Sequence, residues 1–198
     1  MAEYTPLLDT VNALISLEMA KALIGAKITD DAQEVALIFY INAASHYCNT
    51  YTGRSLLSRA NTEYYNGNGD DKLILNNDPV ATLTSVYDDQ AQTFAVGSLI
   101  PATSLYIIPD GLKNIIAYYG GAFTPGYHNI KVVYTAGYAT VPYDLQEACF
   151  GIVALYFYQT QEKRFGITSR SVGDGSTTFD KDVPRWITSI LDGYKKKW

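Results

Sequence analysis

Apolar residues recur at spacings of three and four in the first third of the chain, which is the period of an α-helix. This spacing predicts a short helix over 16–24 and a longer helix over about 30–50. Ser16 and Asp30 stand where side-chain oxygens cap the first turn of a helix. Residues 35–41 are apolar on every side, so we expect the second helix to be buried on more than one face.

The same period returns in the last third of the chain. A helix is expected over about 143–163, with two apolar stripes that place it at the centre of the core. Residues 165–181 follow no period and predict an irregular loop. The last helix, about 183–194, has the clearest separation of apolar and polar faces; Asp182 is expected to cap it and Pro184 to lie in its first turn.

The middle of the chain, about 61–136, has a different pattern, in which short runs rich in β-forming residues alternate with turn residues. Glycine and asparagine at 66–70 predict a hairpin between the first two runs, and Pro109-Asp110-Gly111 predicts a second hairpin. Residues 119–127 are expected to form a loop. The expected strands are 62–65, 72–75, 82–87, 106–108, 112–118 and 130–134.

These elements predict an α+β fold within a single domain spanning 1–198. The helices at about 16–50 and 143–194 are expected to form one α-helical bundle, and the β-rich stretch at about 61–136 is an insertion between them. The length of 198 residues fits one domain that carries a sizeable insertion. No internal repeat or low-complexity tract interrupts this order.

Charge and tyrosine content narrow the range of functions. The net charge of −5 argues against a protein that grips nucleic acid through its phosphates, because such binding needs clustered lysine and arginine. It is compatible with a channel through which DNA passes without adhering. The 17 tyrosines favour subunit interfaces, since tyrosine combines a large ring with a polar tip. A tyrosine-rich β surface without a partner is the alternative.

The two cysteines and the lengths of the hydrophobic runs indicate in which cellular compartment the protein is made. Cys48 and Cys149 each lie within an apolar helical pattern and are expected to be buried free thiols in a reducing cytoplasm. The first residues lack a basic region followed by an apolar stretch, so no secretion signal is expected. The longest apolar run, 148–158, is shorter than the roughly 20 residues that span a bilayer. We therefore expect that the protein is made in the host cytoplasm and does not associate with a membrane.

No pattern in the sequence indicates catalysis, a metal or a cofactor. His46 and Cys48 are two residues apart on a predicted helix and point to different faces, so they do not form a metal pair. The paired aspartates and the glycine-rich segments match turn chemistry and lack the spacing of calcium loops or phosphate loops. These segments are 67–69, 70–71, 88–89 and 173–175. We expect no catalytic, metal or cofactor site.

Several short motifs occur in an order that resembles a known family. Val133-Tyr134-Thr135-Ala136-Gly137-Tyr138 is followed by Val141-Pro142-Tyr143-Asp144-Leu145-Gln146-Glu147-Ala148. Earlier in the chain, Ile41-Asn42-Ala43-Ala44 is followed by Tyr51-Thr52-Gly53-Arg54. Together these motifs resemble the head–tail connector (adaptor, or head completion) proteins of tailed bacteriophages. The long β-rich middle departs from many members, which are smaller and mostly helical.

The resemblance implies a structural protein of the virion neck, between capsid and tail. Such a protein binds the portal as a ring of about 12 copies, each contacting the next through two different faces. The ring continues the DNA channel, without sequence-specific binding, and offers a platform to a stopper or tail-completion protein. The C-terminal region is expected to reach the portal or a neighbouring subunit. The candidate interface residues are Arg170, Val172, Trp186, Tyr194, Lys195, Lys196, Lys197 and Trp198.

Other interpretations of the sequence stay open. Lysines at the end of a helix also favour the helix dipole, with no partner involved. Another neck or tail protein, such as a stopper or tail terminator, is a second possibility, although these are usually β-dominated. A carbohydrate-binding module or an enzyme on the β-rich region is a third, and it requires a convergent polar pocket or an aromatic strip that faces a ligand.

Overall fold

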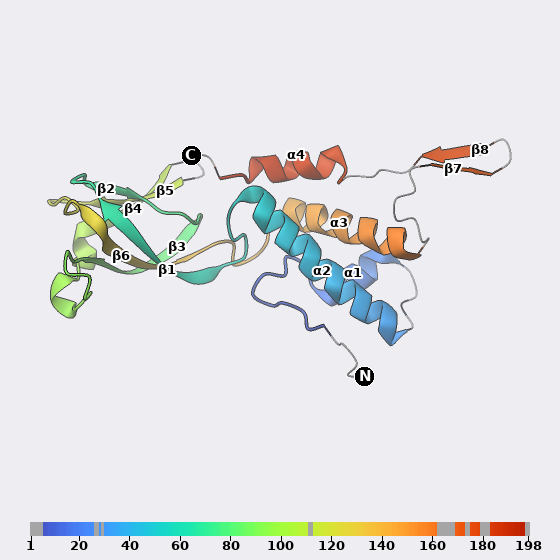
Figure 1. The fold of residues 1–198 in the computed structure, drawn as a ribbon, viewed down its shortest axis with the longest axis horizontal. Helices are drawn as coiled ribbons and strands as arrows, with labels where there is room; N and C mark the ends of the chain where they lie inside the picture. The colour runs from blue at the N-terminus through green and yellow to red at the C-terminus, as the bar shows by residue number, and fades with distance from the viewer. Residues whose placement is uncertain are drawn as a thin grey trace. The chain divides into compact units, whose positions relative to one another are not determined.

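The protein is a mixed α and β chain, as predicted, and is known from a computed structural model (Figure 1). The structure describes residues 6–25, 28, 30–110, 113–161, 169–172, 175–178 and 183–196. The helices are α1 (Leu17–Ile24), α2 (Asp31–Thr52), α3 (Tyr143–Gln161) and α4 (Arg185–Gly193), with short 3₁₀ turns η1 (Val96–Ser98) and η2 (Ala102–Ser104). The strands are β1 (Arg59–Gly67), β2 (Lys72–Ile74), β3 (Val80–Asp88), β4 (Leu105–Asp110), β5 (Lys113–Tyr118), β6 (Gly126–Ala136), β7 (Ser169–Val172) and β8 (Gly175–Thr178).

The chain divides into two compact units. The first, called the helical unit, comprises Met1–Gly53 and Val141–Lys195. The second, called the β unit, comprises Arg54–Thr140 and Lys196–Trp198. A single domain over 1–198, and one bundle built from the helices of both ends, stay predictions.

The first two helices begin and end where their capping residues predicted. The Ser16 hydroxyl accepts a hydrogen bond from the Met19 amide at 3.1 Å, and Asp30 accepts one from the Ala32 amide at 3.1 Å. These contacts satisfy amide groups that have no partner within a helix. Gly25 and Gly53 end the two helices in the left-handed conformation, which closes the last turn.

Helix α3 lies at the centre of the helical unit's packing, with α2 on one side and α4 on another. Cys48 and Cys149 are completely buried in this core, as predicted. Gly151 lets α4 come close: a methyl group at this position would lie 2.8 Å from Cδ1 of Ile187 and 2.8 Å from Cη2 of Trp186. The residue with no side chain therefore sets how near α4 lies to α3.

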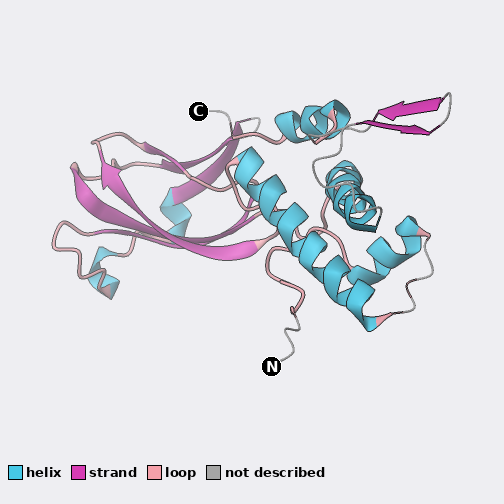
Figure 2. Ribbon diagram, turned by 45° about the vertical axis from the view of Figure 1, so that its right-hand side comes forward, coloured by secondary structure: helices cyan, strands magenta, loops and turns pink. Residues whose placement is uncertain are grey.

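The β unit contains two three-stranded antiparallel sheets, in the orders β1-β6-β3 and β2-β5-β4 (Figure 2). Both sheets contribute side chains to one core. Its members are Leu73, Leu75, Val86, Ile100, Ile116, Phe123, Ile130, Val132, Tyr134 and Ala136. On β6 the residues 130, 132, 134 and 136 are buried in alternation, which is the period of a strand with one face in a core.

The first predicted hairpin is wrong. Strand β1 pairs with β6, with Tyr64 opposite Lys131, and β2 pairs with β5 in the other sheet. The glycine and asparagine turn does occur, but it carries the chain from one sheet to the other. Pairing β1 with β6 covers a long strand whose inner face is buried, and this long-range gain outweighs the local preference for a hairpin. The second hairpin, β4–β5, is confirmed.

The C-terminal third differs from the prediction in two places. The segment 165–181 was predicted to be irregular, yet it contains the antiparallel hairpin β7–β8, in which Arg170 lies opposite Thr177. Serine and threonine alternate there with few apolar residues, so the segment lacks the hydrophobic alternation by which strands are recognised. Helix α4 begins at Arg185, with Pro184 at its N-cap position; the predicted cap, Asp182, lies outside the described residues.

Candidate assembly surfaces

The predicted interface residue Trp186 lies on α4 and is 47% exposed. Ile187 and Leu191, on the adjacent face of the same helix, are completely buried. Trp186 therefore has one part of its ring against Gly151 of α3 and the other part open to solvent. Tryptophan is enriched among the residues that carry most of the binding energy at the centres of protein interfaces, so the exposed part of Trp186 is a candidate anchor.

Tyr194 and Lys195, also predicted interface residues, make contacts within the helical unit. The Tyr194 hydroxyl donates to the Asp144 carboxylate at the start of α3, at 2.7 and 2.8 Å. Lys195 lies 3.1 Å from the Asp192 carboxylate and 4.3 Å from the centre of the Tyr51 ring. These contacts fix the end of α4 on the unit rather than leaving it loose.

Asp192 joins α4 to α2. Its carboxylate accepts a hydrogen bond from the Tyr51 hydroxyl at 2.8 Å, and this bond, followed by the contact with Lys195, lowers the pKa of Asp192. The pKa of Lys195 is raised in turn by its bond to Asp192. The group is exposed, so solvent screens it and its main effect is on geometry.

Lys196 belongs to the β unit. Its ammonium donates to the Asn76 side-chain oxygen at 3.2 Å. Burial lowers the pKa of Lys196, while the charges of Glu63 and Asp78 act in the opposite direction. For Arg170 and Val172 the structure describes the backbone of β7 alone, and Lys197 and Trp198 lie outside the described residues. The role of these eight residues at an interface stays a prediction.

Exposed aromatic residues extend well beyond the predicted set. On α2, Phe39 is 54% exposed although it stands in the run that is apolar all round. At least six tyrosines are more than two-fifths exposed: Tyr64, Tyr106, Tyr119, Tyr127, Tyr143 and Tyr158. The tyrosine count pointed to such surfaces, but only the structure shows which rings stay outside the core.

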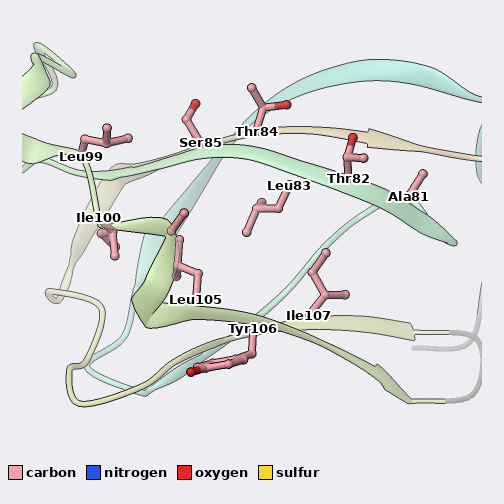
Figure 3. Close-up of a pocket in the computed structure, with 11 residues that line it drawn as sticks. Ala81, Thr82, Leu83, Thr84, Ser85, Leu99, Ile100, Leu105, Tyr106 and Ile107 are labelled. Carbon is pink, nitrogen blue, oxygen red and sulfur yellow. The ribbon is translucent and has the colours of Figure 1, made fainter.

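A groove of about 490 Å³ opens in the β unit between β3 and β4 (Figure 3). Leu83 points into it from β3, and Leu105 and Ile107 face Leu83 from β4. The groove is mainly apolar and has no charged residue in its lining. The lining residues are Ala81, Thr82, Leu83, Thr84, Ser85, Leu99, Ile100, Ala102, Leu105, Tyr106 and Ile107.

The two strands that border the groove are edge strands, and they differ. Strand β3 shifts register against β6 twice, around Ala81 and around Thr84, and such bulges hinder pairing with a further strand. Strand β4 pairs with β5 in unbroken register. On β4, Tyr106 is 53% exposed and Ile108 is 40% exposed. An even, apolar, partly exposed edge strand is a surface that readily pairs with another strand.

A polar cluster around Glu63 ties β1 to the segment before β3. The Glu63 carboxylate accepts hydrogen bonds from the hydroxyls of Tyr65 and Tyr134, the latter at 2.7 Å, and from the Asn77 side chain at 2.9 Å. Tyr134 is completely buried, and burial, followed by its bond to Glu63, raises its pKa to about 12. The cluster is satisfied internally and offers no open site for a ligand.

The shifted pKa of Tyr134 predicts how stability depends on alkaline pH. In the unfolded chain a tyrosine ionises near pH 10. Because the folded pKa is higher, the folded state holds its proton over a range where the unfolded state has lost it. Its contribution is complete below about pH 10 and is lost as pH rises toward about 12. Tyr134→Phe is expected to flatten the decline in the free energy of unfolding over this range, measured by urea titration at several pH values. An unchanged slope in the variant contradicts the assignment.

Among the described residues no group of three or more His, Cys, Asp or Glu side chains is placed to hold a metal ion. None of the helices within the described part of the chain is long and apolar enough to cross a membrane. Two surfaces of the described residues stand out by their exposure and shape: the Trp186 face of α4 and the groove beside β4.

Comparisons with known proteins give a consistent result. Residues 13–197 match the model of a family described as "HCP: Head completion protein". Several solved structures resemble the fold, among them three chains of gene transfer agent (GTA) particles. A chain in "Neck of empty GTA particle computed with C6 symmetry" has a TM-score of 0.65 at 19% identity, with 98% of this chain and 94% of that chain covered.

The other two structures come from similar particles. A chain in "Virion of native gene transfer agent (GTA) particle" has a TM-score of 0.65 at 20% identity, covering 100% of this chain and 94% of that one. A chain in "Neck of native GTA particle computed with C12 symmetry" has a TM-score of 0.59 at 22% identity, covering 100% and 97%. No curated protein matches the sequence.

Proposed function

Because the chain belongs to the head completion protein family, we propose that it is a structural protein of the neck of a tailed phage or phage-like particle. Copies of the chain form a ring between the portal and the tail. The observation that carries the proposal is the family match over residues 13–197, which spans both units of the chain.

The likeness to neck chains supports a ring. Two of the similar chains come from necks computed with C6 and with C12 symmetry. A ring of either symmetry needs a contact between two different faces of each subunit. The chain has two such surfaces in separate units, the Trp186 face of α4 and the groove beside β4. We propose about 12 copies, following the higher of the two symmetries.

The ring continues the DNA channel and serves as a platform for a stopper or tail-completion protein. DNA passes through the lumen without sequence-specific binding, since the net charge of −5 does not favour grip on phosphates. The portal is the partner on the head side. The C-terminal region, from α4 onward, is the part proposed to contact the portal or the adjacent subunit, with Trp186 as its anchor.

Native mass spectrometry of the chain with its cognate portal ring tests the proposal. The expected result is a complex that carries about 12 copies per portal, whether or not the chain alone is monomeric. Ring contacts that are weak in solution become effective once the portal raises the local concentration. A well-formed portal that binds no copies at any protein concentration overturns the proposal.

A further inference from the structure

We propose that the exposed edge of β4, together with the groove beside it, binds the β7–β8 hairpin of a second copy of the chain as an added β-strand. The inference deepens the proposed function, because it names two faces of the subunit that meet in the ring. It rests on that function for the presence of many copies held side by side.

The receiving surface is the edge of β4. Residues 105–108 read Leu-Tyr-Ile-Ile and contain no charge, and natural edge strands usually carry a lysine, a proline or a bulge that prevents pairing. Pro109 and Asp110, the last two residues of β4, follow these four, so the proline and the charge of the strand lie at its far end. Each backbone group on the open side of β4 gains a partner if a strand is added there. Side chains on the inner face of that strand fill the groove against Leu83 and Ile100.

The incoming element is the hairpin β7–β8. Its two strands pair with each other, from Ser169 opposite Thr178 to Val172 opposite Gly175, and its packing with other helices and strands of the described chain is slight. A hairpin of two strands is at best marginally stable alone in water, and three or more strands are needed for independent stability. Docking on β4 and β5 supplies these strands.

Length and charge match on the two sides. Strand β8 is Gly-Ser-Thr-Thr, four residues without charge, and the free apolar part of β4 is also four residues without charge. Threonine is favoured in strands because its branched side chain packs on the pleated surface. Because neither set of four residues carries a charge, no like charges oppose each other across the added pair.

The β4 edge of a second copy is an alternative occupant of the β4 edge, and symmetry favours the hairpin over it. Two β4 edges from different copies are able to pair with each other, but that contact is self-complementary and closes at a dimer. A groove on one copy that receives a hairpin from the next is a contact between different faces, and it repeats around a ring. The neck symmetries of the similar structures are of the second kind.

Cross-linking between copies of the chain tests the proposal. Ile108→Cys places a thiol on the exposed side of β4, and Thr177→Cys places one in β8. The native Cys48 and Cys149 are completely buried and serve as unreactive background. The two single variants are mixed at high concentration in the presence of the cognate portal ring and treated with a short bismaleimide, and the products are mapped by mass spectrometry. We expect a cross-link between a chain carrying Ile108→Cys and a chain carrying Thr177→Cys.

The controls separate the competing results. Thr124→Cys lies on the exposed surface of the β unit outside the groove lining and is expected to give no cross-link with Thr177→Cys. A cross-link formed by Ile108→Cys chains alone shows pairing of two β4 edges and overturns the proposal. The absence of a cross-link between positions 108 and 177 also overturns it.

Introducing a charge on the β4 edge tests the inference independently of cross-linking. Ile108→Lys is expected to weaken ring formation on the portal at least tenfold, measured by titration of the chain onto the portal ring, while Val96→Lys, at a site that is 85% exposed, leaves it unchanged. Thermal unfolding verifies that both variants fold. Copies that still form a ring on the portal with Ile108→Lys, at wild-type affinity, overturn the β4 inference and leave the proposed function standing. If the 108–177 cross-link forms between chains but no ring forms on the portal, the β4 inference stands and the proposed function is overturned.

Discussion

Replacing Arg54 with methionine is expected to lower the free energy of unfolding by about 3–5 kcal/mol, the largest loss expected from a single change in the β unit. The Arg54 side chain is completely buried, and its Nη1 donates to the Asp78 carboxylate and, at 3.1 Å, to the Asp78 carbonyl oxygen. The Asp78 side chain is only 6% exposed. Removing the guanidinium leaves a buried carboxylate without a counter-charge, and this accounts for the size of the effect.

The double variant Arg54→Met with Asp78→Asn distinguishes this cause from loss of packing. Both charges are then absent, and the double variant is expected to recover most of the stability lost in Arg54→Met. The Nε and Nη2 atoms of Arg54 have no hydrogen-bond partner among the described residues, so the pair itself adds little net stability. Urea unfolding followed by circular dichroism measures each variant. Arg59→Met, at an exposed arginine only five residues away, is the control and is expected to change stability by about 0.5 kcal/mol or less. Equal losses in the single and double variants contradict the explanation.

The role of Arg54 shows what a sequence motif does and does not convey. Tyr51-Thr52-Gly53-Arg54 contributed to the resemblance, yet nothing in its spacing indicated that Arg54 pairs with a residue 24 positions away. Gly137, in the second motif, is similar. It has a φ of +106°, and a methyl group there would lie 2.6 Å from the Leu57 carbonyl oxygen. Both constraints come from distant parts of the chain, and pattern arguments along the sequence do not reach them.

Local chemistry predicted the helices well because their caps lie within one turn of their ends. Ser16 and Asp30 accept amide hydrogen bonds at helix starts, and the apolar period of α3 placed its buried residues. The positions of the strands were predicted approximately, but the partner of β1 was predicted wrongly. Strand partners are chosen by burial across the whole unit, and a turn of glycine and asparagine fits a hairpin and a crossing between sheets equally well.

The sequence indicated one of the two candidate surfaces and not the other. The apolar spacing of the last helix included Trp186 among the residues of its apolar face, and the structure shows that this ring is 47% exposed. The edge of β4 was missed, since an apolar run of four residues predicts a strand without indicating whether that strand lies inside a sheet or at its border. The order of strands in the sheet supplies this information.

Trp186→Ala is expected to reduce binding to the portal ring by about 30-fold or more, equivalent to a hot-spot loss of about 2 kcal/mol or more. The ring is half exposed and lies against Gly151, so the fold loses only part of its buried area and we expect a stability loss of about 1–2 kcal/mol. The adjacent Ile187 is completely buried, and Ile187→Ala is the matched control: it is expected to destabilise the fold by about 2–5 kcal/mol through a cavity beneath α4.

Binding is measured by titration onto immobilised portal at a temperature where both variants are folded. If Trp186 acts at an interface, its variant loses binding out of proportion to its stability, whereas the Ile187 variant loses stability and retains most of its binding. The reverse pattern indicates that Trp186 only holds α4 on α3, and the contact with the portal then has to be sought on another surface of the chain.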